Sequence, residues 1–228
     1  MTCTLTWLEA APAPARFVVA WGEGLGEVWS ERGAAALTVR IAEVVAEVAA
    51  RGAGHYPADR QQQVRKMLRH GRYRPTGRAK PASEYLFQAA CQGDFPRLLP
   101  VVDVNNLLSL ESGLPISIFD AALVSEGLGG RWGVAGEGFV FNPSGQRIAV
   151  DDLLVLCRRL PAGEWEACGS PVKDAQVTKV GVETRRVVGV VYVPVATPEG
   201  ECVALGERFA EYLRDFAGCS RAAWALVG

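Results

Sequence analysis

Apolar side chains recur at helical spacing in three segments of the first half of the chain. The first segment covers 36–52, where apolar residues return every three or four positions. The second covers 59–71 and begins at Asp59, in the pattern of a capping box. The third covers 83–93, with Ser83 as its expected N-cap. We therefore predict three helices before residue 95.

The second half of the chain changes to the pattern of buried strands. Short apolar runs bounded by turn residues predict strands. One such run lies near the N-terminus, and the others lie in the second half of the chain. The expected strands lie at 16–22, in a hairpin over 138–150, at 153–158 and at 186–195. Residues 198–218 return to helical spacing. Helices followed by strands and a last helix indicate a mixed α+β domain rather than a βαβ series.

Two glycine-rich segments have no phosphate-binding pattern. The segment 21–27, "WGEGLGE", lacks the dinucleotide fingerprint, and no clean helix is expected after it. We interpret it as a turn. The segment 127–138, "GLGGRWGVAGEG", is interpreted as a flexible connection.

Small polar residues interrupt an otherwise apolar stretch at 101–120, "VVDVNNLLSLESGLPISIFD". A buried polar group is costly unless it finds a partner, so these residues need one. Asp103 is suitably placed to cap a helix over the residues after it. Two adjacent asparagines and a serine exceed what one cap needs. The polar residues of this stretch are Asp103, Asn105, Asn106, Ser109 and Asp120.

A second polar segment, 170–186, lies between two expected strands. Its side chains offer both donors and acceptors, as the lining of a binding pocket does. The polar residues of this segment include Lys173, Asp174, Gln176, Thr178, Lys179 and Thr184.

Positive charge is concentrated in one part of the chain, although the net charge is −1. From Arg60 to Lys80 there are eight Lys or Arg residues and no Asp or Glu. Arginine pairs with phosphate, and an aromatic ring stacks on an unpaired base. We therefore expect nucleic-acid contacts there, through backbone phosphates rather than through the base sequence. The residues expected to make these contacts are Arg65, Lys66, Arg69, Arg72, Tyr73, Arg74 and Arg78.

Composition narrows the chemistry further. With 228 residues, the chain has the size of one large domain or two small ones. Six scattered cysteines and two histidines make no zinc pattern, and we expect neither a metal nor another cofactor. No apolar run is long enough to cross a membrane, and the N-terminus has no signal-peptide pattern. Free thiols then fit a cytoplasmic protein.

Three segments together resemble a known family. They are "PASEYLFQAACQGDFPRLLPVVDVNNLLSLESGLPISIFD", "LLVLCR" and "DAQVTKVGVETRRVVGVVYVP". In this order they resemble the editing domain (B-three/four) of the phenylalanyl-tRNA synthetase beta subunit, in particular the free-standing proteins built from that domain alone. The resemblance covers roughly residues 55–195.

The resemblance implies an α+β fold with a mixed β-sheet flanked by helices. It also implies one domain over 1–228, in which 55–195 is the editing-domain-like core and 1–54 and 196–228 are additions. In the synthetase, this domain hydrolyses tyrosine wrongly attached to the phenylalanine tRNA. The reaction is explained there by a positioned water and the RNA's terminal hydroxyl, without a protein nucleophile.

Residue roles follow from the resemblance as expectations. Asp103 and Asn106 match the family motif and would fix the entry of a helix. The expected catalytic residues are Gln176, Ser117 and Thr178. Ser117 stands where the synthetase domain has a histidine, and Gln176 stands where it has a glutamate, so both changes remove an ionisable group. The expected substrate-binding residues are Asp103, Asn105, Asn106, Ser109, Asp120, Asp174 and Thr184.

Three functions remain open from the sequence. The first is a deacylase that binds tRNA and clears a mischarged aminoacyl ester in trans. The second is a module that binds an amino acid or a similar small molecule without catalysis. The third is an RNA-binding protein without hydrolysis, or one whose basic face meets another acidic partner.

Overall fold

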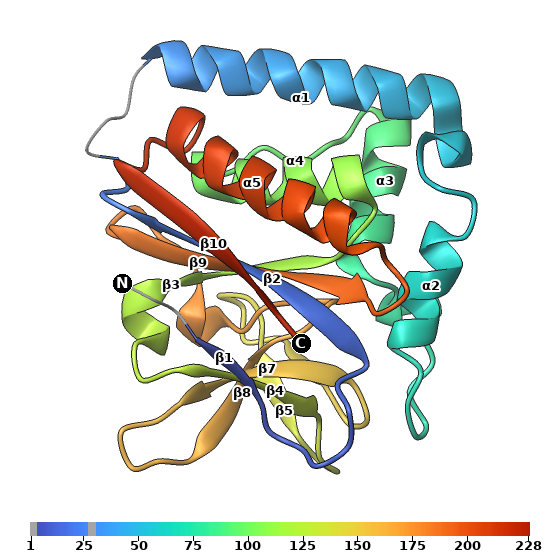
Figure 1. Cartoon of the computed structure of the whole chain (residues 1–228), viewed down its shortest axis with the longest axis vertical. Helices are drawn as coiled ribbons and strands as arrows, with labels where there is room; N and C mark the ends of the chain where they lie inside the picture. The colour runs from blue at the N-terminus through green and yellow to red at the C-terminus, as the bar shows by residue number, and fades with distance from the viewer. Residues whose placement is uncertain (1–3, 27–30) are drawn as a thin grey trace.

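The computed structural model describes residues 4–26 and 31–228. Its fold is α+β, with a layer of helices on one four-stranded sheet and a second four-stranded sheet beneath it (Figure 1). The buried hydrophobic residues of both sheets and of the helices form one continuous core. In the described part of the chain, no helix has the length and apolar character needed to cross a membrane.

The upper sheet is antiparallel throughout. Its strand order is β10 (Arg221–Val227), β2 (Ala15–Glu23), β9 (Arg186–Pro194) and β3 (Ile116–Asp120). Every residue of β9 after Arg186 is buried, because β9 is covered by strands on both edges and by protein on both faces. This agrees with its nearly continuous run of apolar residues.

The lower sheet is mixed. Its order is β1 (Leu5–Trp7), β4 (Leu128–Trp132), β7 (Leu154–Arg159) and β8 (Trp165–Gly169). The β1–β4 pair is parallel, and the other pairs are antiparallel. A separate hairpin joins β5 (Gly138–Val140) to β6 (Arg147–Ala149).

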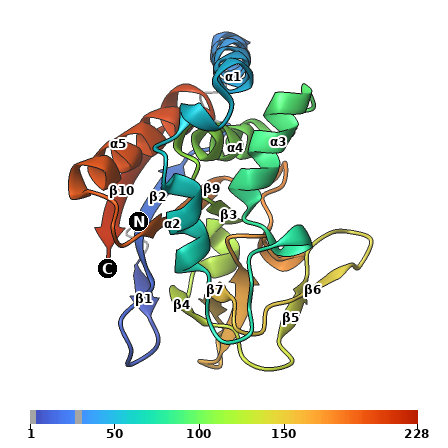
Figure 2. The same ribbon diagram turned by 90° about the vertical axis from the view of Figure 1, so that its right-hand side faces the viewer.

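The helical layer contains α1 (Glu31–Arg51), α3 (Ala82–Gln92), α4 (Pro100–Ser112) and α5 (Glu199–Asp215). Helix α5 packs on β2 and β10, whereas α4 packs on β3 and lies between α1, α3 and α5. The short helix α2 (Arg60–Met67) descends from this layer beside the sheets and contacts β9 (Figure 2). The described residues also form the 3-10 turns η1 (Gly52–His55), η2 (Gly77–Ala79), η3 (Ala121–Val124) and η4 (Gln176–Thr178).

The segments outside 55–195 are part of the core of the molecule. Strand β2 pairs with β9 over nine residues, and β10 pairs with β2 on its other edge. Two of the four strands of the upper sheet therefore come from these flanking segments, and α5 covers them.

Most predicted elements are confirmed, but several boundaries were wrong. The helix expected over 59–71 ends at Met67. Pro81 occupies the N-cap position expected for Ser83, and Leu99 occupies the one expected for Asp103. In both helices a proline at the entry sets the backbone angle without a capping side chain.

Two interpretations of glycine-rich segments also need correction. The expected flexible connection over 127–138 contains strand β4 at its start. In the expected turn over 21–27, residues 21–23 belong to strand β2, and the helix expected over 36–52 begins earlier, at Glu31. Residues 27–30 lie outside the described part of the chain.

Candidate functional site

Helix α4 carries the two adjacent asparagines to the edge of a cavity. Pro100 opens this helix, and Gly113 ends it in the left-handed conformation, at φ 71°. The helix buries its apolar residues against α1, α3, α5 and β3. Asn105 is buried and Asn106 is partly exposed, and both line the cavity.

The cavity has a volume of about 370 Å³ and lies between α4, β3 and the segment 170–180. This volume is near the lower end of the range of small-molecule sites, roughly 300–1,000 Å³. Its walls are apolar side chains from the entry of α4, from β3 and from the 170–180 segment. Its polar lining residues are Asn105, Asn106, Ser170, Lys173, Asp174 and Lys179.

Asp174 is the acidic residue of this cavity. The Ser117 hydroxyl donates to Asp174 Oδ1 at 2.6 Å, and the Ile118 backbone N–H donates to Oδ2 at 3.2 Å. Ser117 is also hydrogen-bonded to the Tyr192 hydroxyl at 2.8 Å. Ser117 and Tyr192 are fully buried, so this chain of hydrogen bonds holds the carboxyl group from the core side and leaves its other side to the cavity.

The surroundings of Asp174 oppose its negative charge. Burial raises the pKa of this carboxyl group to about 7, although hydrogen bonds from Ser117 and Ile118 and the positive charge of Lys179 act in the opposite direction. Asp174 keeps some surface because it faces the cavity, yet protein encloses its other sides. No Lys or Arg of the described residues lies within ion-pair distance of it. The group therefore changes charge near neutral pH.

The two lysines of the cavity are held by Phe141, which follows β5. Lys179 Nζ donates to the Phe141 carbonyl oxygen, and Lys173 Nζ lies 4.7 Å from the centre of the Phe141 ring. Burial lowers the pKa of Lys179. The contacts with Phe141 hold both ammonium groups at the hairpin.

The other residues expected to bind substrate stabilise the backbone around the cavity. Asp103 accepts hydrogen bonds from Leu98 N and Arg97 Nε, and so holds the entry of α4. Ser109 donates to the Leu114 carbonyl oxygen inside the core. Asp120 accepts from the Thr184 hydroxyl at 2.6 Å and caps η3.

The three residues expected to be catalytic do not face one cavity. Ser117 lies behind Asp174 in the core. Thr178 is buried, and its hydroxyl bonds to the carbonyl oxygens of Cys168 and Ala175. Gln176 lines a separate open groove beside β5 and β8. The structure thus groups Asn105, Asn106 and Asp174 but separates Gln176 from them.

The structure adds residues that the pattern did not single out. Tyr192 supports Ser117 from the middle of β9, where the sequence shows only a strand residue. Leu98 lines the cavity and is 67% exposed. A large exposed apolar residue beside a cavity indicates a binding site, but its exposure is known only once the fold is known.

The basic segment divides into paired and free cations. The Arg60 guanidinium is buried and pairs with Glu201, and Arg65 forms two hydrogen bonds with Glu84, at 2.7 and 2.6 Å. The exposed cations of this segment are Lys66, Arg69, Arg72, Arg74 and Arg78. We refer to these five side chains as the exposed basic strip.

The Tyr73 side chain stabilises the loop of this segment from within. Its ring is half-buried against the core, and its hydroxyl donates to the Ala79 carbonyl oxygen at 2.6 Å. Burial raises its pKa. Tyr85 donates to the Gly77 carbonyl oxygen, so two tyrosines hold the loop from within. The expected stacking of Tyr73 on a base would compete with these contacts.

The loop of the basic strip ends beside the cavity. Ala82 lines the cavity at the start of α3, and its N–H donates to the Pro171 carbonyl oxygen at 2.8 Å. The chain therefore runs from the exposed cations directly to the cavity wall.

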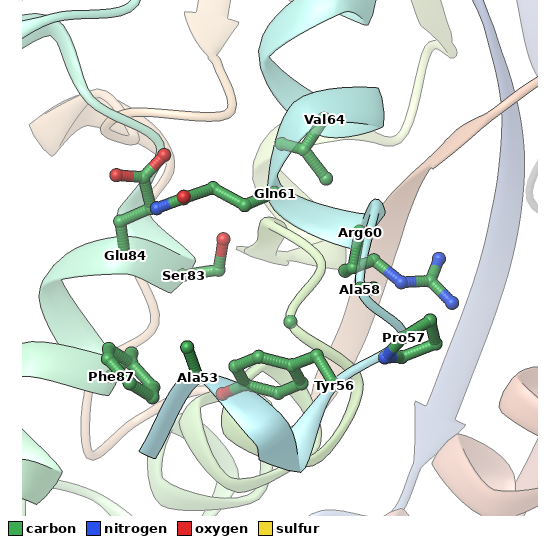
Figure 3. A pocket seen from close by; sticks show the side chains of 11 residues that line it. Ala53, Tyr56, Pro57, Ala58, Arg60, Gln61, Val64, Ser83, Glu84 and Phe87 are labelled. Carbon is green, nitrogen blue, oxygen red and sulfur yellow. The ribbon is translucent and has the colours of Figure 1, made fainter.

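A second, smaller cavity lies between η1, α2 and α3 (Figure 3). Its volume is about 120 Å³. The Gln61 side chain extends toward Glu84, whereas the Arg60 guanidinium extends away from Ser83 and Phe87. Glu84 and Arg60 are both committed to ion pairs, so we assign no chemistry to this cavity.

Comparison with known proteins adds no identification. The chain matches no protein-family model and no curated protein. Among the described residues, no cluster of three His, Cys, Asp or Glu side chains is arranged to hold a metal ion.

Proposed function

We propose that the protein binds the aminoacyl end of a tRNA and hydrolyses a mischarged aminoacyl ester in trans, as a free-standing editing domain would. One observation carries this proposal: a cavity of the size of a small-molecule site, lined by Asn105, Asn106 and Asp174, has in its wall Ala82, where the loop that carries exposed cations ends. An RNA phosphate backbone fits the cations, and its esterified amino acid fits the cavity.

Hydrolysis of an aminoacyl ester in such a site needs no nucleophilic side chain from the protein. Water attacks the acyl carbon, the bond from that carbon to the ribose oxygen breaks, and a water proton passes to the ribose oxygen. Orientation and polarisation of the carbonyl group lower the barrier. The Asn106 carboxamide lines the cavity and offers N–H donors for the carbonyl oxygen.

A second candidate is an amino-acid-binding module without catalysis. It is favoured by the separation of Ser117, Thr178 and Gln176, which leaves the cavity without the set of catalytic groups expected from the family motif. The same cavity would then hold a free amino acid.

A deacylation screen tests the proposal. The purified protein is incubated with correctly and wrongly charged tRNAs, beginning with tyrosyl-tRNA(Phe), and ester loss is followed against a buffer blank. We expect selective hydrolysis of one mischarged species. Asn106→Ala should lower its rate about 100-fold, as loss of one oxyanion donor does, while circular dichroism shows an intact fold.

Asp94→Asn, at an exposed residue that does not line the cavity, is the matched control and should keep the rate. Folded wild-type protein that hydrolyses no charged tRNA would contradict deacylation. Binding of a free amino acid by that same protein would then support the module.

A further inference from the structure

We propose that the cavity anchors the α-ammonium group of its ligand between Asp174 and Asn105, and so selects amino acids or their esters with a free amino group and an apolar side chain. This inference deepens the proposed function, because it rests on the cavity being the aminoacyl site. It names the part of the ligand that the cavity recognises.

The first argument is a carboxyl group without a counter-ion. Each Asp174 oxygen receives one hydrogen bond from the protein, from Ser117 or from Ile118, and each oxygen has further acceptor capacity. Among the described residues, no cation lies within ion-pair distance of it. A carboxylate in such surroundings is unfavourable until a cation pairs with it. A ligand ammonium group supplies that cation.

The second argument is an independent acceptor in the same cavity. The carboxamide oxygen of Asn105 is buried and has no hydrogen-bond partner, and Asn105 is only 6% exposed. A buried acceptor without a partner calls for an explanation, and a ligand donor is one. An ammonium group has three donors, enough for Asn105 and Asp174 together.

The nearby lysines form no ion pair with Asp174, although the positive charge of Lys179 favours its carboxylate from a longer distance. Lys173 and Lys179 both line the cavity, but their ammonium groups are held at Phe141, one over its ring and one at its carbonyl oxygen. They lie on the hairpin side, where they can meet an anionic part of the ligand, such as the phosphate of a terminal nucleotide. The cavity is therefore polarised, with acceptors at Asp174 and cations at Phe141.

The third argument concerns the ligand side chain. Val102, Ile116, Ile118 and Val180 contribute apolar walls, and Leu98 presents a largely exposed side chain beside them. An apolar ligand side chain would cover these residues and gain the free energy of their removal from water. The cavity thus fits an aliphatic or aromatic amino acid better than a polar one.

Binding of small esters tests this inference without tRNA. The methyl esters of leucine, phenylalanine and tyrosine are titrated into the full-length protein at pH 7.5 by calorimetry, beside the N-acetylated form of each. We expect at least one free ester to bind and its N-acetylated form to bind at least tenfold more weakly. Asp174→Asn should weaken the free ester at least tenfold, and Asp94→Asn should leave its affinity unchanged.

Equal affinity for the free and N-acetylated esters would overturn the inference, as would no binding of any ester. Unchanged affinity in a folded Asp174→Asn protein would also overturn it. If the protein binds free esters but hydrolyses no charged tRNA, ammonium recognition is supported and the deacylase proposal is contradicted. If it hydrolyses charged tRNA but shows no preference for a free amino group, the deacylase proposal is supported and ammonium recognition is contradicted.

Discussion

Asp174 is predicted to reduce the stability of the folded protein above neutral pH. Its pKa is about 7 in the folded protein and about 4 in an unfolded chain. Between these values the folded state holds a proton that the unfolded state has lost, so stability falls as pH rises through this window. Asp174→Asn removes the ionisation and should raise stability by about 1–3 kcal/mol at pH 8, with little change at pH 4.

The hydrogen bonds of Asp174 allow this substitution. The carboxamide oxygen of an asparagine can accept from Ile118 N, and its amino group can donate to the Ser117 hydroxyl, which can turn toward Tyr192. Tyr192 stays neutral because burial raises its pKa well above the ordinary value. Urea denaturation of both proteins at pH 4 and pH 8 measures the difference. A variant that is less stable at pH 8 would show that the carboxylate stabilises the fold.

At this scale the sequence indicates which residues matter but not where they point. Buried polar residues in 101–120 needed partners, and the structure shows two different outcomes. Ser109 finds its partner in a backbone carbonyl group, whereas Asn105 faces the cavity. Both lie on α4, and only the packing of that helix between α1, α3, α5 and β3 separates the two outcomes.

Strand β9 and helix α5 are fitted together through a glycine. Gly189 lies in the middle of β9, and a Cβ atom there would overlap the ring of Phe209 on α5. Gly189→Ala should therefore destabilise the protein by about 1–3 kcal/mol, because the core must shift to admit a methyl group. Thermal denaturation followed by circular dichroism measures this loss.

Two further variants separate crowding from other effects of replacing glycine. A Cβ atom at Gly200, in the first turn of α5, meets nothing within 4 Å, so Gly200→Ala should not destabilise the helix. Adding Phe209→Leu to Gly189→Ala should restore part of the lost stability, since the two sites are in contact. A Gly189→Ala protein as stable as the wild type would contradict this account of the packing.

Elements with a strong local pattern could be predicted from the sequence, and elements defined by distant partners could not. The run of valines in β9 and the helical spacing of α1 and α5 were sufficient. Strand β4 contains two glycines, and it is extended because β1 and β7 pair with its two edges. Strand β10 is rich in alanine, a residue depleted in strands, and its pairing with β2 determines its conformation.

Over the whole molecule, positive charge is concentrated in the exposed basic strip, whose loop ends at the cavity wall, although the net charge is −1. The strip and the cavity come from separate patterns in the sequence, and the fold joins them where Ala82 bonds to Pro171. An approaching RNA would meet the strip first, because exposed cations attract phosphates over a distance near the Debye length, about 8–10 Å.

The ion pair between Arg65 and Glu84 allows a test of whether the exposed cations bind RNA, because it provides a cation of the same segment that is already paired. Replacing both Lys66 and Arg69 with Gln removes two free cations and should lower the slope of log affinity against log salt by about 1.4–1.8 for tRNA. Arg65→Gln removes the same type of charge, but from an ion pair, so it should change RNA affinity less and lower stability by about 1 kcal/mol. Filter binding from low to moderate salt, with Arg159→Gln as the control outside the strip, measures both effects. If Arg65→Gln weakened binding more than the double variant, or if wild-type binding ignored salt, the basic strip would not be the RNA surface.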